Sequence, residues 1–432
     1  MNAPAKTNRN TLPGADDITR VVLPNGITVL ARPNFSSLSV IVNGYLEVGS
    51  LFDTDEKLGL AHYTGLSLMR GTAQRSFQQI YNALESVGAS LGFGAGVQST
   101  GFNGHALAED LPLLLDLLAE ALRQPVFPLE QVERLRAQLL TGLAMRAQDT
   151  QEMSSLTFDR IVYEGHPYRR PEDGYVETIQ AIKVEDLAAF HRKHFGPRHM
   201  VVVVVGAVDP ARAVEQVERA LGSWQNPEQP ALPPLPALMA LQQTVRKHIY
   251  IPGKSQTDLV MGSSGPARRS PDYISASLGN NILGQFGMMG RIGDVVREQS
   301  GLAYYASSSL NAGVGPGTWE VSAGVNPENL EKAISLIQSE ILRFVNEPVS
   351  SEELSDSQAN YIGRLPLSLE SNGGVAGSLV NLERYELGLD YYRKYADMVH
   401  SVTPESILET ARRYLNPNIL AISSAGPEGT PS

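Results

Sequence analysis

The stretch FHRKHFGPRHMVVVVVG at residues 190–206 recurs 220 residues later as TARRYLNPNILAISSAG at residues 410–426. Laid on each other, the two stretches place Pro197 on Pro417, and both end at a glycine. Each joins a segment with helical spacing of apolar residues to a short apolar run that is typical of a buried strand. The recurrence predicts that the chain consists of two homologous halves.

The repeat extends beyond these stretches. The same offset places Pro128 on Pro348 and Glu133 on Glu353. The glycine-rich turn GVGPG at 313–317 can hold the few extra residues of the second half. A chain of 432 residues is also long enough for two to four packed units, since one domain commonly takes roughly 100 to 200 residues.

A proline-rich segment separates the two halves. Five prolines fall within residues 227–236, and their fixed φ angles and missing N–H groups favour an extended linker over 224–245. We therefore predict an N-terminal domain at 1–223 and a C-terminal domain at 246–432.

Both halves contain strand and helix patterns. The expected strands are short, rich in β-branched or aromatic residues and bounded by Gly, Pro or Asn; they lie at 27–33, 38–48, 200–206, 250–262 and 318–325. One expected helix carries an apolar stripe from Leu330 to Phe344, with Asn326 as its cap and Pro327 in its first turn. Its counterpart carries a stripe from Leu111 to Leu122. These patterns predict an α+β fold with a helix-covered sheet in each half.

The composition excludes several classes of function. With 35 Lys and Arg against 46 Asp and Glu, the net charge is −11 and no basic stripe occurs, so we expect no nucleic-acid partner. The absence of cysteine excludes thiolate metal sites and cysteine nucleophiles, which leaves His and carboxylates as the only metal ligands. The longest apolar run, Met200–Val205, is too short for a bilayer. We expect a cytoplasmic protein without membrane contact, or a periplasmic one if an export signal has been removed.

Three segments look like functional motifs but have simpler explanations. LGFGAG at 91–96 lacks the dinucleotide-binding spacing and favours a hairpin or bulge. GSSG at 262–265 lacks the nucleophile-elbow spacing and is explained by turn chemistry. His191 and His194 align with Ala411 and Tyr414 of the repeat, which indicates packing or surface roles.

The histidine with a functional context is His62, in GLAHYTGLSLMRGT at 59–72. A helical H-x-x-E-H pattern gives a zinc hydrolase two imidazoles one turn apart and a carboxylate for the attacking water. The segment resembles the G-L-A-H-F-L-E-H pattern of the pitrilysin (insulinase) family of zinc metallopeptidases. In that comparison Gly65 replaces the general-base Glu, Leu66 the second His and Gly142 the third ligand. The resemblance implies a degenerate motif and no metal in this chain.

The resemblance covers nearly the whole chain and implies mostly antiparallel sheets. REQSGLAYYASSS at 297–309 is similar to the family's R-E-x-x-G-L-A-Y, so Arg297 and Tyr304 match its substrate-binding Arg and Tyr. Such donors can stabilise the oxyanion that forms during peptide hydrolysis. The alternatives are an Arg297 that pairs with Asp294 or the helix dipole, and a Tyr304 that packs as an ordinary strand residue like Tyr305.

A glycine-rich segment, GQFGMMGRIGD at 284–294, precedes these residues. By resemblance it is a substrate loop that uses Gly284, Gly287 and Gly290. The alternative is a turn between two helices.

The resemblance implies a heterodimeric peptidase in which this chain is the non-catalytic, substrate-binding subunit. It is expected to be inactive alone and to have no cofactor of its own; a homologous partner subunit would hold the zinc, and peptides would be cleaved in a closed chamber. The alternative is a catalytically dead scaffold or peptide-binding protein of the same fold. A third hypothesis is a homodimer with an unusual metal site that uses His62, His166 or His199.

Overall fold

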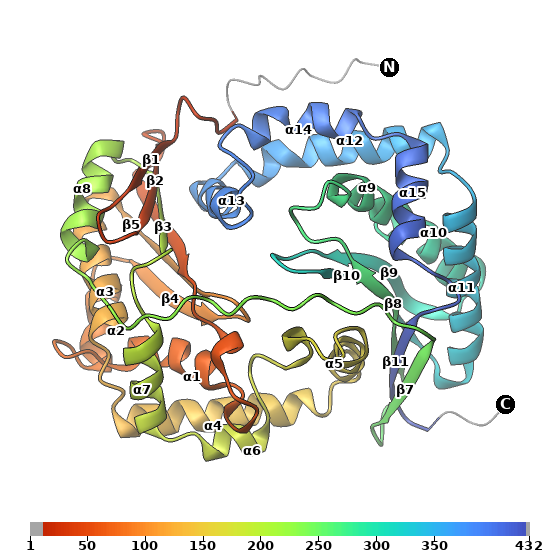
Figure 1. Ribbon diagram of the computed structural model, residues 1–432, viewed down its shortest axis with the longest axis horizontal. Coiled ribbons are helices and arrows are strands. Elements are labelled where there is room, and N and C mark those ends of the chain that lie inside the picture. Colours follow the sequence, from red (N-terminus) through yellow and green to blue (C-terminus); the bar gives the residue numbers. More distant parts are fainter. Residues whose placement is uncertain (1–11, 429–432) are drawn as a thin grey trace. The chain divides into compact units, whose positions relative to one another are not determined.

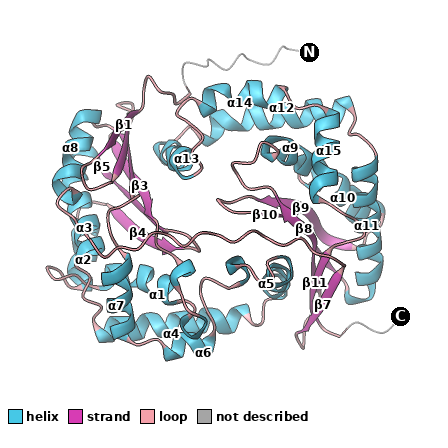
Figure 2. Cartoon of the chain, in the orientation of Figure 1, coloured by secondary structure: helices cyan, strands magenta, loops and turns pink. Residues whose placement is uncertain are grey.

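The computed structural model describes residues 12–428, apart from the side chains of Phe286, Met288 and Met289. The chain forms two compact units (Figures 1 and 2). The first contains the described residues up to Leu143, with Arg170–Pro234 and Pro366–Arg393; the second contains Ala144–Arg169, Leu235–Leu365 and the described residues from Lys394 on. Each unit therefore combines segments from both halves of the sequence.

The first unit is built on a six-stranded sheet with the order β1-β2-β6-β3-β5-β4. The strands are β1 Thr19–Val22, β2 Thr28–Pro33, β3 Ser39–Leu46, β4 Ser90–Ala95, β5 Thr100–Leu107 and β6 Val201–Gly206. The β2–β6 pair is parallel and the other pairs are antiparallel. Every residue of β6 is buried, which explains its unbroken run of valines: a strand covered on both faces has no polar side.

Helices cover this sheet and extend its core. They are α1 Leu60–Ser67, α2 Phe77–Glu85, α3 Leu111–Arg123, α6 Val176–Ala181, α7 Val184–His194, α8 Pro210–Leu221 and α13 Asn372–Arg384. Figure 1 shows α3 and α8 on one face of the sheet and α13 on the other. The buried leucines of α3 lie in the same apolar cluster as Val202 and Val204 of β6, as the helical spacing predicts.

The second unit is built on a five-stranded sheet with the order β7-β11-β8-β10-β9. The strands are β7 Val245–Tyr250, β8 Thr257–Gly265, β9 Ala303–Asn311, β10 Gly317–Val325 and β11 Ala421–Gly426. The β7–β11 pair is parallel and the other pairs are antiparallel. The order repeats that of β2-β6-β3-β5-β4 in the first unit, so the sequence repeat is also a repeat of topology.

The helices of the second unit are α5 Thr150–Val162, α9 Tyr273–Gly284, α10 Phe286–Gly293, α11 Leu330–Asn346 and α15 Pro404–Tyr414. The apolar stripe of α11 packs into a core that includes Trp319 and Phe344. The expected cap Asn326 accepts a hydrogen bond from the N–H of Glu328 and opens a short 3₁₀ turn from which α11 continues. Three helices continue from one unit into the other: α4 Leu129–Arg146, α12 Ser351–Ser368 and α14 Tyr391–His400.

The two halves of the sequence exchange one helix each. Helix α13 packs on β3 and β6, and Asn372 at its start exchanges hydrogen bonds with Asn34 and Ser39. Helix α5 packs on β8 and β11, and its Thr150 hydroxyl donates to the Asp258 carboxylate. The two helices start 222 residues apart, close to the repeat offset. Each sheet thus has one face covered by a helix from the opposite half of the sequence.

The α+β fold with mostly antiparallel, helix-covered sheets is confirmed. Several local expectations change. The expected strand at 250–262 is divided: Tyr250 ends β7, and the residues from Thr257 on lie in β8. GSSG at 262–265 continues β8 instead of forming a turn. LGFGAG at 91–96 lies largely in β4, one arm of the β4–β5 hairpin, as expected. The segment from 225 to 244 contains no helix or strand, and the two units meet in sequence within it, at Pro234.

Among the helices of residues 12–428, none is both long enough and apolar enough to cross a membrane.

Asp159 on α5 makes the stability of the second unit dependent on pH. Burial, together with the nearby Glu320 carboxylate, raises the pKa of Asp159 to about 7. Because the folded chain holds a proton that the unfolded chain releases near pH 4, stability falls as the pH rises from about 4 to about 7. Asp159→Asn should therefore increase the free energy of unfolding by roughly 2 to 4 kcal/mol at pH 8 and much less at pH 4. Urea denaturation of both proteins between pH 4 and pH 8 measures this difference in the free energy of unfolding.

The control for this experiment is Glu164→Gln, which changes an exposed carboxylate just beyond the end of α5. It should leave the pH profile unchanged. An Asp159→Asn variant that follows the native profile at every pH would contradict the assignment.

Candidate functional site

Helix α1, which carries His62, is fixed at its start by a buried carboxylate. Asp53 accepts hydrogen bonds from the N–H groups of Gly59 and Ala61, at 2.9 and 3.0 Å. Gly59 has φ +91°, which favours glycine at this helix start. Burial raises the pKa of Asp53 to about 7, whereas the N–H groups act to lower it. Asp53 has no signal in the local sequence, because nothing in the pattern around it shows that it caps a helix that begins several residues later.

His62 lies half-buried beside β4. Its Nδ1 is 3.3 Å from the carbonyl oxygen of Ala95. Glu172 is near enough to interact electrostatically: burial raises the pKa of its carboxyl, and His62 acts to lower it. Glu172 belongs to the segment EGHPYRRPEDG, where sequence analysis saw family likeness but assigned no role to this residue. The imidazole of His62 and the carboxylate of Glu172 are therefore two groups near this helix that could bind a metal ion.

The other positions of the zinc motif hold an apolar side chain that packs in the core or a glycine without a side chain. A side chain at Gly65 would start 3.0 Å from the Cβ of Ala95, so this buried position has little free space. Leu66 packs against the apolar core of the first unit. Gly142 is exposed on α4, with open space around its Cα. The residues present therefore do not fit a catalytic zinc ion, which needs three protein ligands.

The remaining histidines do not form a metal site within the described residues. His166 is buried against Tyr163 and Tyr168, and its Nδ1 accepts the N–H of Tyr168. His191 binds the carbonyl oxygen of Leu122, and His199 is exposed. Across residues 12–428 the structure contains no group of three or more His, Asp or Glu side chains that could hold a metal ion.

Arg297 lies on a short π-helical segment, Asp294–Gln299, between α10 and β9. Its side chain is 36% exposed, and the nearest carboxylate is that of Glu298, at 3.6 Å. Asp294, the expected alternative partner, instead accepts a hydrogen bond from Gln299 at 2.7 Å. The guanidinium therefore keeps most of its donors available. π-Helical turns inside longer helical runs are frequent at functional sites.

Tyr304 stands at the start of β9, which is an edge strand of the five-stranded sheet. Its side chain is 74% exposed, and its hydroxyl makes no hydrogen bond to any residue in the described part of the chain. Tyr305 differs: its hydroxyl donates to Asp258 at 2.7 Å. Adjacent strand residues point to opposite faces, so Tyr305 supports the sheet while Tyr304 is presented to solvent.

The glycine-rich segment is helical, so the expected loop is wrong in form. Helix α9 ends at Gly284, and α10 runs from Phe286 to Gly293. Gly287 and Gly290 have φ +62° and +64°, and these left-handed residues interrupt the regular helix. At Gly284 a Cβ would lie 2.2 Å from the backbone nitrogen of Ser308, so the end of α9 can approach β9 only with glycine.

Two parts of the chain match known peptidase domains. Residues 29–171 match the domain described as insulinase (peptidase family M16), and residues 181–361 match the peptidase M16 inactive domain. An uncharacterized zinc protease of Streptomyces coelicolor is 27% identical over 408 residues, which cover 93% of this chain and 88% of that protein.

Solved structures agree in fold. The peptidase M16 inactive domain from Pseudomonas fluorescens superposes with a TM-score of 0.87 at 27% identity, and covers 96% of this chain and 100% of its own. A protease from Helicobacter pylori gives a TM-score of 0.88 with the same coverage at 19% identity, which shows likeness of fold alone.

The residues at the His62 site predict how much zinc the purified protein retains. After exhaustive dialysis, the purified chain should retain less than about 0.1 zinc per molecule, because one imidazole and one nearby carboxylate fall short of the three protein ligands that a catalytic zinc ion needs. His62→Ala should not change that content. Elemental analysis by mass spectrometry measures it, and one zinc per chain that is lost with His62→Ala would contradict this reading of the site.

Proposed function

We propose, on the premise that the chain belongs to the insulinase family of M16 peptidases, that it is the non-catalytic, substrate-binding subunit of a two-chain zinc metallopeptidase. The observation that carries the proposal is an asymmetry between two sites. The positions of metal ligands and general base hold Gly65, Leu66 and Gly142, whereas Arg297 and Tyr304 retain donors that the second unit leaves largely unused.

The chemistry of these two side chains suits a peptide backbone. A guanidinium stays charged at any working pH and presents several N–H donors in a fixed plane, and a phenol adds one directed O–H. Aimed at a peptide carbonyl, the donors of Arg297 and Tyr304 would orient the substrate and stabilise negative charge on its oxygen. Zinc held by a homologous H-x-x-E-H partner would supply the activated water.

The edge position of β9 supports peptide as the substrate class. An edge strand offers unpaired N–H and C=O groups along which an extended peptide can add as a further strand. Tyr304 stands at the start of that strand, and Arg297 lies a few residues before it in the chain. Main-chain recognition of this kind selects extended segments more than particular side chains.

Reconstitution tests the proposal. The chain alone should not cleave a quenched fluorescent peptide, and it should do so when mixed with a family member from the same organism that carries H-x-x-E-H. Arg297→Ala and Tyr304→Phe should each lower kcat/KM of the mixture about 100-fold, the typical effect of removing one oxyanion donor. Size-exclusion chromatography should show that both variants still bind the partner.

Matched controls come from β7 of the same unit. Arg246→Ala and Tyr250→Phe change an exposed arginine and a tyrosine that is 57% exposed, so both should retain activity within about twofold. Undiminished activity of the Arg297 and Tyr304 variants would disprove the role assigned to them. Tight peptide binding with no cleavage in any mixture would instead favour the peptide-binding scaffold.

A further inference from the structure

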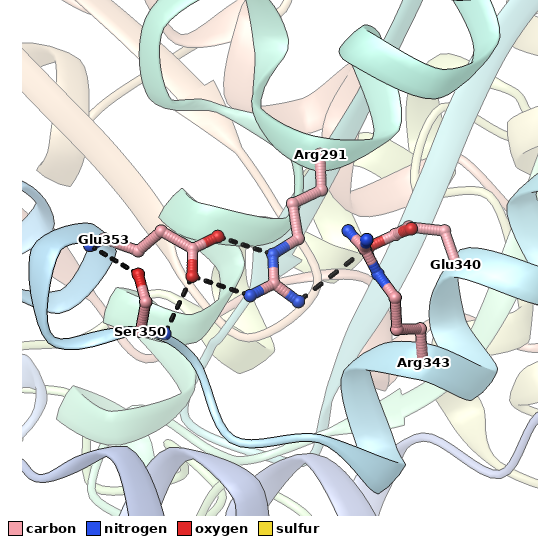
Figure 3. A network of polar contacts seen from close by, with 5 residues as sticks. All are labelled: Arg291, Glu340, Arg343, Ser350 and Glu353. Carbon is pink, nitrogen blue, oxygen red and sulfur yellow. Dashed lines mark hydrogen bonds and ion pairs between the residues drawn. The ribbon is translucent and has the colours of Figure 1, made fainter.

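Arg291, on α10 and six residues before Arg297, lies at the centre of a polar network (Figure 3). Its side chain is only 13% exposed. Its Nε and Nη2 donate to the two carboxylate oxygens of Glu353 at 2.6 and 2.7 Å. Its Nη1 lies 3.9 Å from the buried Glu340, and the guanidinium carbon is 5.7 Å from the centroid of the Phe344 ring. Two of the three guanidinium nitrogens therefore hydrogen-bond to Glu353, and the third lies within ion-pair distance of Glu340.

The carboxylate that receives Arg291 is itself fixed. Glu353 accepts the N–H of Ser350 at 2.8 Å and donates its own N–H to the Ser350 hydroxyl at 3.1 Å, which forms a capping box at the start of α12. The hydrogen bonds from Arg291 contribute most to lowering the pKa of Glu353, to about 2, so the pair stays ionised at any physiological pH. Glu340, on α11, is also held by Arg343 at 2.8 Å. Two helices thus anchor Arg291.

The segment that Arg291 anchors has little rigidity of its own. Gly287 and Gly290 take left-handed φ angles, and nothing lies within 4 Å of the position that a Cβ of Gly287 would occupy. The π-helical segment with Arg297 follows directly. Among the described side chains of this stretch, Ile292 and Val296 are also anchored in the apolar core, and the backbone at Gly290 lies close against the end of α9. Apolar contacts keep a segment buried, but they do not fix its orientation, because the hydrophobic effect is not directional.

We propose that Arg291 is a positioning residue whose two-point bond to Glu353 sets the orientation of the π-helical segment and hence of Arg297. The inference rests on the proposed function for its catalytic consequence. A buried ion pair often contributes little net stability compared with apolar side chains, because desolvation offsets the attraction. A bidentate arginine–carboxylate pair does supply geometric specificity. Direction, more than stability, is what a donor such as Arg297 requires.

A spin label can test the positioning role without a partner. The chain has no cysteine, so Glu298→Cys gives one attachment point for a nitroxide on an exposed residue beside Arg297. In this background Arg291→Lys keeps the charge and loses the two-point geometry. Glu353→Gln keeps the capping box, which accepts Glu or Gln, and loses the ionised acceptor. Each should increase the mobile fraction of the spectrum about twofold or more in the folded protein, well below the urea midpoint of each variant.

The control is a second two-point pair in the same unit, between Arg246 and Glu331, which is exposed. Arg246→Lys should leave the spectrum of the label unchanged. Unchanged spectra for both Arg291→Lys and Glu353→Gln would overturn the proposal. If Arg291→Lys failed to fold, Glu353→Gln alone would decide, because it preserves the cap of α12.

The reconstituted peptidase supplies the second readout. Both variants should lower kcat roughly 10- to 100-fold with a smaller change in KM, since a misplaced catalytic donor affects the chemical step most. A mobilised label without activity in any mixture would support the positioning role and reject the proposed function. Full activity in the mixture with a mobilised label would overturn the claim that Arg291 acts through Arg297.

Discussion

The structure depends on covering the second face of each sheet with a helix from the opposite half of the sequence. All residues of β6 and of β11 are buried, so both faces of these strands must be shielded from water. Helix α13 shields β6, and α5 shields β11. Directional bonds fix these helices: Asn372 bonds to Asn34 and Ser39, and Thr150 bonds to Asp258. Neither half of the sequence contains everything its own sheet needs.

The two candidate sites, around His62 and around Arg297 and Tyr304, differ in the side chains that they keep available. Around His62, the position of the second metal ligand packs against the core, at Leu66, and the position of the general base carries no side chain, at Gly65. The scaffold of that site remains in order, since Asp53 still fixes the start of α1. In the second unit, Tyr304 is exposed although its neighbour Tyr305 is bound to Asp258.

The stretch that leads to Arg297 contains both glycines and a buried ion pair. Glycines allow the end of α9 to approach β9 at Gly284 and permit left-handed turns at Gly287 and Gly290, but they also weaken the local helix. The pair formed by Arg291 and Glu353 opposes that freedom with two short, directed bonds. The segment thus combines an adaptable backbone with one rigid point, an arrangement suited to presenting a charged donor at a constant angle.

The sequence by itself determined the duplicated organisation, the α+β class and the leucine-rich helices, and it shows that Gly65, Leu66 and Gly142 can supply neither a metal ligand nor a general base. These features depend on residue identity and short-range periodicity. It also placed Arg297 and Tyr304 in a family motif. Only the tertiary structure decided which half covers which sheet, that Tyr304 is exposed while Tyr305 is bound, and that Arg291 pairs with Glu353 62 residues away. The glycine segment was expected to be a loop by resemblance, or a turn between two helices; its composition indicates flexibility but does not show the contacts that make most of it helical. Long-range pairing depends on how distant segments meet in space, which no local pattern of residues encodes.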